Sequence, residues 1–153
     1  MNIYYLDASA WVKRYYQETG TDWMIHLFSQ NPLFASASLG LIEVLATLAR
    51  KQKAHEIDEA NYEQKLQEIE ADWLRFIQVQ LTDVIVQKTK TLTKDYALRG
   101  ADAIHLASAL HLQELFANQN DHLIFVTSDL ELKSAAQQSH LTVTDPNLVQ
   151  NQP

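Results

Sequence analysis

The chain has 153 residues, of which 46% are hydrophobic, and a formal net charge of -7. This length suits one domain with a substantial core and is too short for two domains of ordinary size. The absence of cysteine excludes a disulfide framework and a thiolate metal site, and it favours a cytoplasmic location. Seven acidic residues lie between Glu56 and Asp72 against Lys65 alone, so most of the acidity belongs to one helix and leaves a nucleic-acid partner possible elsewhere.

The start of the chain lacks the features of a targeting segment. No basic segment precedes its apolar run, which meets an acid at Asp7, so we expect no signal peptide. No apolar stretch approaches the roughly 18 residues that a membrane span needs. We therefore expect no membrane partner.

Strand-like and helix-like segments alternate along the chain, separated by breaks such as Thr19-Gly20-Thr21 and Asn31-Pro32. The expected strands are, in order, residues 3–6, 33–37, 76–81, 123–127 and 141–144. The expected helices are residues 8–16, 22–28, 38–53, 58–74, 82–97, 101–116 and 130–138, with Ser38 as the N-cap of the third. We expect one domain over residues 1–148 and a frayed tail over 149–153.

This order of elements predicts an α/β fold with a doubly wound parallel sheet between two layers of helices. The runs at 3–6 and 123–127 are apolar throughout, which is typical of central strands that helices cover on both faces. The segments 76–81 and 141–144 alternate apolar with polar residues, so they should lie at the edges of the sheet.

Four acidic residues occupy unusual places in this pattern. Asp7 and Asp129 end the two most apolar strands, Asp102 opens the most apolar helix, and Glu43 lies in an apolar helical turn after the second strand. Taken singly, three of them could be helix-capping acids, and Glu43 could point into solvent. If the strands wind outward from the first strand in both directions, however, all four acids lie over the crevice where the strand order reverses.

An all-oxygen ligand set favours Mg²⁺ or Mn²⁺ over Zn²⁺. Carboxylates within ~5 Å of one another repel by about 3 kcal/mol per pair at an effective dielectric of 20, so such a cluster calls for a cation. One or two divalent ions at this crevice suit the hydrolysis of a phosphodiester by in-line displacement. An aspartyl phosphatase is a weaker alternative, since those enzymes usually carry a second Asp two residues after the first, where this chain has Ser9.

The sequence contains three motifs, with helical Glu43 between the first and the second: Leu6-Asp7-Ala8-Ser9, Gly100-Ala101-Asp102-Ala103-Ile104-His105-Leu106-Ala107-Ser108-Ala109 and Phe125-Val126-Thr127-Ser128-Asp129. Together these features resemble the PIN-domain ribonucleases. The sequence is most similar to the VapC-type toxins of prokaryotic toxin–antitoxin pairs. The resemblance covers almost the entire chain and implies a five-stranded parallel sheet of order 3-2-1-4-5.

The resemblance also implies roles for individual residues. Asp7, Glu43 and Asp102 match the principal acids of the family, Asp129 matches a more variable fourth acid, and Ser9 and Thr127 match polar positions beside them. We interpret His105, one turn after Asp102, as a partly buried helical histidine without a metal role. The family often has glycine before its last strand, where this chain has Ser139-His140.

These features lead us to expect a Mg²⁺- or Mn²⁺-dependent endoribonuclease toxin that a cognate antitoxin keeps inactive. The competing interpretation is a non-catalytic PIN-like interaction module with a structural cation site. Candidate RNA contacts are the basic residues near the acids, each of which could instead be an ordinary solvated side chain: Lys13, Arg14, Arg50 and Arg99.

We also expect a homodimer, because the family commonly pairs through its early helices. Four large apolar residues of the early helix are the candidate interface, and their alternative place is the core of the chain itself: Trp23, Met24, Leu27 and Phe28.

Overall fold

The computed structural model describes residues 1–149, which form one α/β domain. Its strands are β1 (Asn2–Leu6), β2 (Leu33–Ala37), β3 (Ile77–Val79), β4 (His122–Val126) and β5 (Thr142–Thr144). Its α-helices are α1 (Ala8–Trp11), α2 (Thr21–Ser29), α3 (Ser38–Lys53), α4 (Glu59–Trp73), α5 (Asp83–Tyr96), α6 (Gly100–Phe116) and α7 (Leu130–Gln138). A short 3-10 helix, Val12–Arg14, directly follows α1.

The five strands form a parallel sheet of order β3-β2-β1-β4-β5, which confirms the predicted fold and strand order. β1 lies between β2 and β4, with Tyr5 opposite both Ala35 and Phe125. Leu6, the last residue of β1, pairs with Val126, the last residue of β4. The loops after these two central strands therefore leave the sheet side by side, where ligands of open α/β sheets bind.

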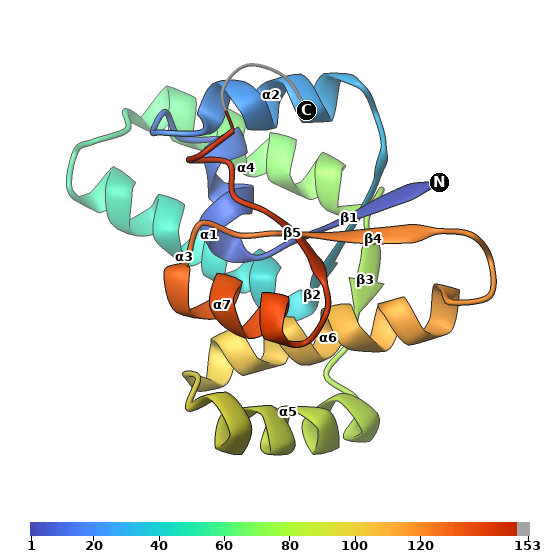
Figure 1. The fold of residues 1–153 in the computed structure, drawn as a ribbon. Helices are drawn as coiled ribbons and strands as arrows, with labels where there is room; N and C mark the ends of the chain where they lie inside the picture. Colours follow the sequence, from blue (N-terminus) through green and yellow to red (C-terminus); the bar gives the residue numbers. More distant parts are fainter. Residues whose placement is uncertain (150–153) are drawn as a thin grey trace.

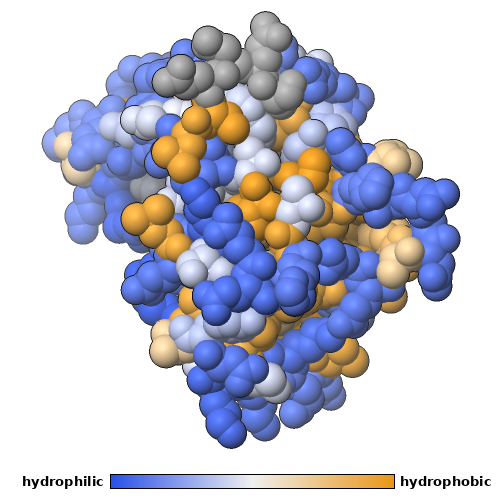
Figure 2. Space-filling model, in the orientation of Figure 1, coloured by the Kyte–Doolittle hydropathy of each residue, from blue (hydrophilic) through white to orange (hydrophobic). Residues whose placement is uncertain are grey.

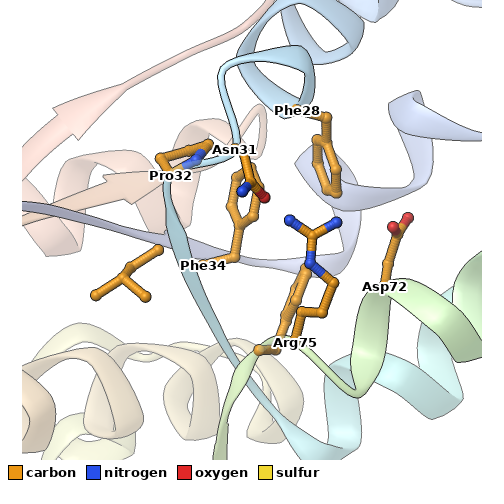
Figure 3. Close-up of a pocket in the computed structure, with 8 residues that line it drawn as sticks. Phe28, Asn31, Pro32, Phe34, Asp72 and Arg75 are labelled. Atoms are coloured by element: carbon orange, nitrogen blue, oxygen red, sulfur yellow. The ribbon is translucent and has the colours of Figure 1, made fainter.

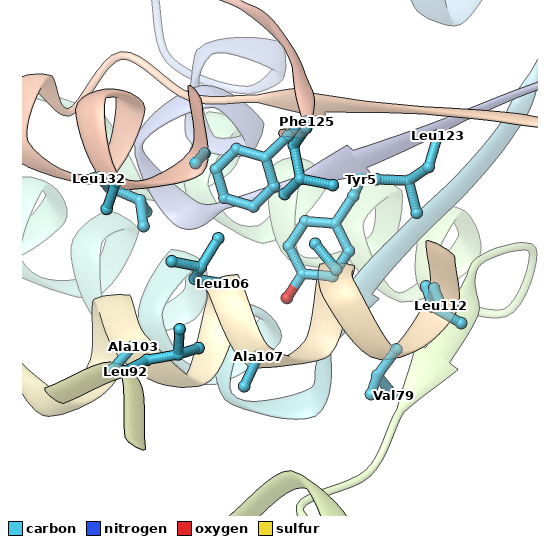
Figure 4. Packing of buried hydrophobic residues seen from close by; sticks show 14 of the residues in the cluster. Tyr5, Val79, Leu92, Ala103, Leu106, Ala107, Leu112, Leu123, Phe125 and Leu132 are labelled. Atoms are coloured by element: carbon cyan, nitrogen blue, oxygen red, sulfur yellow. The ribbon is translucent and has the colours of Figure 1, made fainter. Parts of the chain in front are cut away.

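Successive side chains of β1 enter two separate cores because strand side chains alternate between the faces of a sheet. Ile3 and Tyr5 pack against α5, α6 and α7. Leu6 packs on the opposite face in a cluster built from α1, α2, α3 and α4. The helices thus form one layer on each side of the sheet (Figure 1), and the buried side chains of the first cluster are seen from close by in Figure 4.

Several boundaries differ from the sequence-based expectations. The helix expected over residues 8–16 ends at Trp11 and continues only as the 3-10 turn. The edge strand β3 is shorter than expected because Thr82 already caps α5, accepting a hydrogen bond from the Ile85 amide. The expected N-cap Ser38 is instead the first residue of α3, and Ala37 occupies the cap position. The expected frayed tail lies outside the described residues, apart from Val149, which packs on the second core cluster.

The large side chains of α2 proposed for a dimer interface are inside the domain. Trp23, Met24 and Leu27 are buried, and Phe28 is partly buried against Phe34. The intramolecular alternative is therefore correct for these residues. Polar residues cover much of the face seen in Figure 2, with apolar residues exposed in smaller groups. Within residues 1–149, no helix has both the length and the apolarity needed to cross a membrane.

Candidate active site

Asp7 stands directly after the central strand β1 and is almost completely buried. Its carboxylate accepts hydrogen bonds from the Thr127 hydroxyl at 2.6 Å, from the Ser9 hydroxyl at 2.8 Å and from the Ala10 amide at 3.0 Å. Burial raises the pKa of Asp7 above its ordinary value, whereas nearby His105 and these hydrogen bonds act in the opposite direction. Asp7 caps α1, as the simpler interpretation expects, but a cap alone does not require burial or two hydroxyl donors.

Thr127 and Ser9 connect this carboxylate to the loop after β4. Thr127 is fully buried, and its oxygen also accepts a hydrogen bond from the Asp129 amide at 3.1 Å. The Ser9 oxygen accepts a hydrogen bond from the Ser128 amide at 3.0 Å. The structure therefore brings Ser9 and Thr127 to Asp7, and the pairing of β1 with β4 is the reason.

Asp102 and Asp129 form a second acidic pair. Asp129 caps α7 through the Leu132 amide, whereas Asp102 lies in the first turn of α6 and is not its cap. The Arg99 guanidinium bridges them, with Nε 3.2 Å from Asp102 Oδ2 and a terminal nitrogen 3.5 Å from Asp129 Oδ2. Burial, followed by the negative charge of Asp129, raises the pKa of Asp102, and Arg99 partly offsets this rise.

Glu43 lies on α3 and contacts α6. Its Oε1 atom is 2.6 Å from Nε2 of His105, and the Glu43 side chain remains 30% exposed. His105 is buried rather than partly buried, so the sequence interpretation of its environment was wrong in that respect. The sequence contains one indication that His105 faces the acids, because His105 lies three residues after Asp102 and therefore on the same side of α6.

The four acids lie at the same end of the sheet, but their carboxylates do not form one compact cluster. Among the described residues, no group of three or more His, Asp and Glu side chains lies close enough together to hold a metal ion. Each carboxylate has partners within the protein: hydroxyls hold Asp7, His105 contacts Glu43, and Arg99 pairs with both Asp102 and Asp129. The donor chemistry nevertheless fits a hard divalent cation, since all four ligands would be oxygens. Burial, the main cause of the raised pKa values of Asp7 and Asp102, disfavours their charged forms, and a bound cation would stabilise these forms.

A groove of about 650 Å³ lies beside Glu43 and the residues that directly follow β1 and β4. It runs between the start of the first helix, α3 and the loop after β4, and Ser9, Glu43 and Ser128 are among its lining residues. Two of the predicted RNA-contact residues, Lys13 and Arg50, also line it. Lys13 is buried and pairs with Glu18 at 3.0 Å.

Arg14 points elsewhere. Its guanidinium carbon lies 4.7 Å from the ring centroid of Phe28, and its Nε is 3.5 Å from Asp72 Oδ2. The 3-10 turn ends at Arg14 and directs it toward the α2–α4 side of the domain. The structure thus does not bring Arg14 to the acids or the groove.

A second, smaller pocket of about 220 Å³ lies near the same Phe28 and Asp72, as Figure 3 shows with Arg75, Asn31 and Pro32. It opens at the amino-terminal end of β2, because its lining includes Pro32 and Leu33. The acids lie beyond the opposite ends of the strands, so this pocket is separate from the candidate site.

A further acid, Asp145, was not singled out in the sequence although it directly follows β5. It is buried, accepts hydrogen bonds from the Ser128 hydroxyl at 3.0 Å and the Asn147 amide at 2.9 Å, and lies 3.5 Å from Lys133 Nζ. These contacts connect the residue after β5 to Ser128, in the loop that follows β4.

A parallel sheet of order β3-β2-β1-β4-β5, with a buried acid at the carboxyl end of its central strand β1, defines the PIN-like class of α/β domains. The sequence is 37% identical over 110 residues to Ribonuclease VapC45 of Mycobacterium tuberculosis (strain CDC 1551 / Oshkosh), across 72% of this chain and 76% of that protein. The chain therefore belongs to the VapC ribonuclease family.

Two solved structures are similar in fold. The structure of VapBC2 from Rickettsia felis bound to a DNA fragment from their promoter matches 94% of this chain and 98% of that chain, with a TM-score of 0.63 and 14% identity. A toxin–antitoxin complex from Klebsiella pneumoniae matches 93% of this chain and 96% of that chain, with a TM-score of 0.60 and 16% identity. At these identities the likeness concerns the fold alone. No protein-family model matches the chain.

Proposed function

We propose that the chain is a Mg²⁺- or Mn²⁺-dependent endoribonuclease and the toxin of a toxin–antitoxin pair. The observation that carries this proposal is the burial of Asp7 and Asp102 at one end of the sheet, in a chain 37% identical to a ribonuclease. Structural carboxylates are seldom buried with so few compensating cations, whereas catalytic ones often are.

Asp7, Glu43 and Asp102 would hold the cation, with Asp129 as an additional ligand. A divalent cation stabilises the negative charge that develops on the oxygens of a phosphodiester during in-line displacement. Thr127 and Ser9 orient the Asp7 carboxylate through their hydroxyl groups.

The groove beside the acids is the proposed path of the RNA strand. Arg50 is exposed on α3 and lines the groove, so it can contact phosphates along the strand. Lys13 also lines the groove, but it is buried and paired with Glu18, and we leave it out of the RNA contacts. Arg99 is 75% exposed at the other side of the acids, and we propose that it contacts the RNA backbone as well. Arg14 is left out of this set because it packs on Phe28.

The proposed antitoxin would cover this groove with a peptide and offer a basic side chain to the acids. The groove suits such a peptide because Ile42, 60% exposed, lies directly beside Glu43. A guanidinium forms two parallel hydrogen bonds with a carboxylate, which favours arginine in this role. The toxin–antitoxin complex from Klebsiella pneumoniae, which has the same fold, supports the existence of a protein partner. Sequencing the neighbouring genes for a small reading frame with a basic or aromatic tail tests the idea.

Cleavage of total cellular RNA in the presence of Mn²⁺ tests the enzymatic proposal. Asp7→Asn, Glu43→Gln and Asp102→Asn should each abolish cleavage while circular dichroism shows an intact fold, because each change removes a charge and little volume. Asp129→Asn should have a milder effect. Asp58→Asn is the matched control, since Asp58 caps α4 at an exposed position outside the acids.

Wild-type cleavage rates in the Asp7 and Asp102 variants would refute the assignment of the site. A wild-type protein that binds Mn²⁺ tightly but leaves every RNA intact would instead favour the interaction module with a structural cation.

A further inference from the structure

A continuous chain of polar groups runs from β1 through α6 to the Glu43 carboxylate. The Tyr5 hydroxyl is 2.9 Å from Nδ1 of His105, and Nε2 of His105 is 2.6 Å from Oε1 of Glu43. Tyr5 and His105 are both buried, with exposed fractions of 0% and 1%. Figure 4 shows the Tyr5 hydroxyl directed from the strand toward α6. The function proposed above uses neither residue directly.

The hydrogen-bond partners determine the direction of this chain. The Ala37 amide donates to the Tyr5 oxygen at 3.1 Å, so the Tyr5 proton is available for His105. A carboxylate oxygen can only accept, so Nε2 of His105 donates to Glu43. In the tautomer that carries its proton on Nε2, Nδ1 accepts the hydrogen bond from the Tyr5 hydroxyl.

Packing fixes the positions of both rings. The Tyr5 ring stacks on Phe125 with centroids 5.4 Å apart and meets the His105 ring edge-on at 5.9 Å. A Cβ atom on Gly40 would lie only 3.0 Å from Cε1 of His105 and 2.5 Å from the Ser36 hydroxyl. Glycine at this position thus allows α3 to approach α6 closely. Glu43, three residues later, lies on the same side of α3 and reaches His105.

The contact occupies one oxygen of Glu43. The second oxygen, Oε2, accepts no hydrogen bond from the described residues, and the Glu43 side chain borders the groove beside Asp7. A ligating carboxylate that is held by one oxygen loses little rotational freedom when its other oxygen binds a cation. Asp7 has the corresponding arrangement, in which hydroxyl donors hold the carboxylate from the protein side.

We propose that Tyr5 and His105 are positioning residues that set the orientation of Glu43 for a divalent cation. This inference rests on the proposed role of Glu43 as a metal ligand. Supporting partners of this kind typically contribute a 10- to 100-fold difference in metal affinity. Loss of either residue should therefore weaken cation binding even in the absence of RNA.

The test is the Mn²⁺ dissociation constant of the purified full chain, measured by electron paramagnetic resonance of unbound Mn²⁺, together with the melting temperature. Tyr5→Phe and His105→Leu should weaken Mn²⁺ binding about 10- to 100-fold. His105→Gln should recover part of the affinity, because an amide N–H can donate to Glu43 in place of Nε2.

Tyr15→Phe is the matched control. Tyr15 is also buried, and its hydroxyl donates to Asp72 at 2.6 Å and accepts from Trp11 Nε1 at 2.9 Å, in the other core cluster. This variant should melt at a lower temperature than wild type and keep the wild-type Mn²⁺ affinity.

Unchanged Mn²⁺ affinity in a folded Tyr5→Phe variant would overturn the inference, even if His105→Leu failed to fold. Equal losses of affinity in Tyr5→Phe and Tyr15→Phe would also overturn it, because they would indicate general loosening of the core. RNA cleavage is measured separately: if wild type binds Mn²⁺ without cleaving RNA and the variants still differ as expected, the positioning role stands while the nuclease assignment falls.

Discussion

Replacement of Thr127 by valine removes the hydroxyl that donates to the buried Asp7 carboxylate and that also accepts a hydrogen bond from the Asp129 amide. Thr127 is fully buried, and its hydroxyl donates to Asp7 at 2.6 Å. Valine keeps the shape of the side chain and removes the donor, which leaves an ionised group without one of its partners. Hydrogen bonds to charged groups contribute about 1.5 to 3 kcal/mol, so the melting temperature should fall by about 3 to 12 °C near neutral pH.

The pH dependence of this loss has a definite sign. The Thr127 hydrogen bond lowers the pKa of Asp7, so its removal raises that pKa further above the ordinary aspartate value. A raised folded-state pKa of an acid means that stability is lost as pH rises from the unfolded-state value, about 3.9, through the folded-state pKa. The destabilisation should therefore be smallest at acidic pH, where Asp7 is protonated, and largest near neutral pH.

Thr21→Val is the matched control for this measurement. Thr21 is buried too, but its hydroxyl donates to the Tyr16 carbonyl at 3.1 Å and accepts from the Glu18 amide at 2.9 Å. Both partners are uncharged, so this variant should lose about 0.5 to 1.5 kcal/mol with little dependence on pH. Both variants and wild type are melted in EDTA across a pH series. Equal losses in the two variants, constant with pH, would refute the reasoning.

Four further predictions concern Asp102, the Mn²⁺ response, the groove and the oligomeric state. In EDTA near neutral pH, Asp102→Asn should melt above wild type, because burial and Asp129 raise the pKa of Asp102. Mn²⁺ at 100 times its dissociation constant should raise the free energy of unfolding of wild type by about 2.7 kcal/mol, which raises its melting temperature by about 5 to 10 °C. The Asp102→Asn variant should respond less to Mn²⁺. An Asp102→Asn variant that melts below wild type in EDTA, together with a wild type that does not respond to Mn²⁺, would contradict these two predictions. Arg50→Gln should weaken RNA binding in fluorescence anisotropy without altering the Mn²⁺ response, whereas Arg75→Gln, at the separate pocket, should leave RNA binding unchanged. The family resemblance predicts a homodimer, and a monomer mass by light scattering at micromolar concentration would exclude it.

Hydrophobic patterning predicts most of the fold because each central strand is buried on both faces. The unbroken apolar runs at 3–6 and 123–127 became β1 and β4, which lie in the middle of the sheet. The alternating run at 76–81 gave only the short edge strand β3, with three pairs to β2. Alternation of apolar and polar residues indicates that one face of a strand is exposed. It does not specify where the strand ends, which here depends on the position of Thr82, the N-cap of α5.

The acids of the candidate site could also be located from the sequence, because Asp7 and Asp129 end apolar strands. Their partners could not be predicted. The bridge from Arg99 to Asp129 spans 30 residues, and the contact between His105 and Glu43 spans 62, so both depend on how α6 packs against α3 and α7. Arg14 illustrates the same limit, since the unpredicted change from α1 to a 3-10 turn alters the direction in which it points.

The central claim is that the protein hydrolyses RNA and that these acids would hold the divalent cation on which cleavage depends. Its most direct test is the rate at which the protein, first stripped with EDTA, cleaves total cellular RNA as Mn²⁺ is added back. We predict no cleavage before the addition, a saturable rise with Mn²⁺ for wild type, and no rise for Asp7→Asn. Cleavage that persists in EDTA, or that rises equally in Asp7→Asn, would contradict the claim.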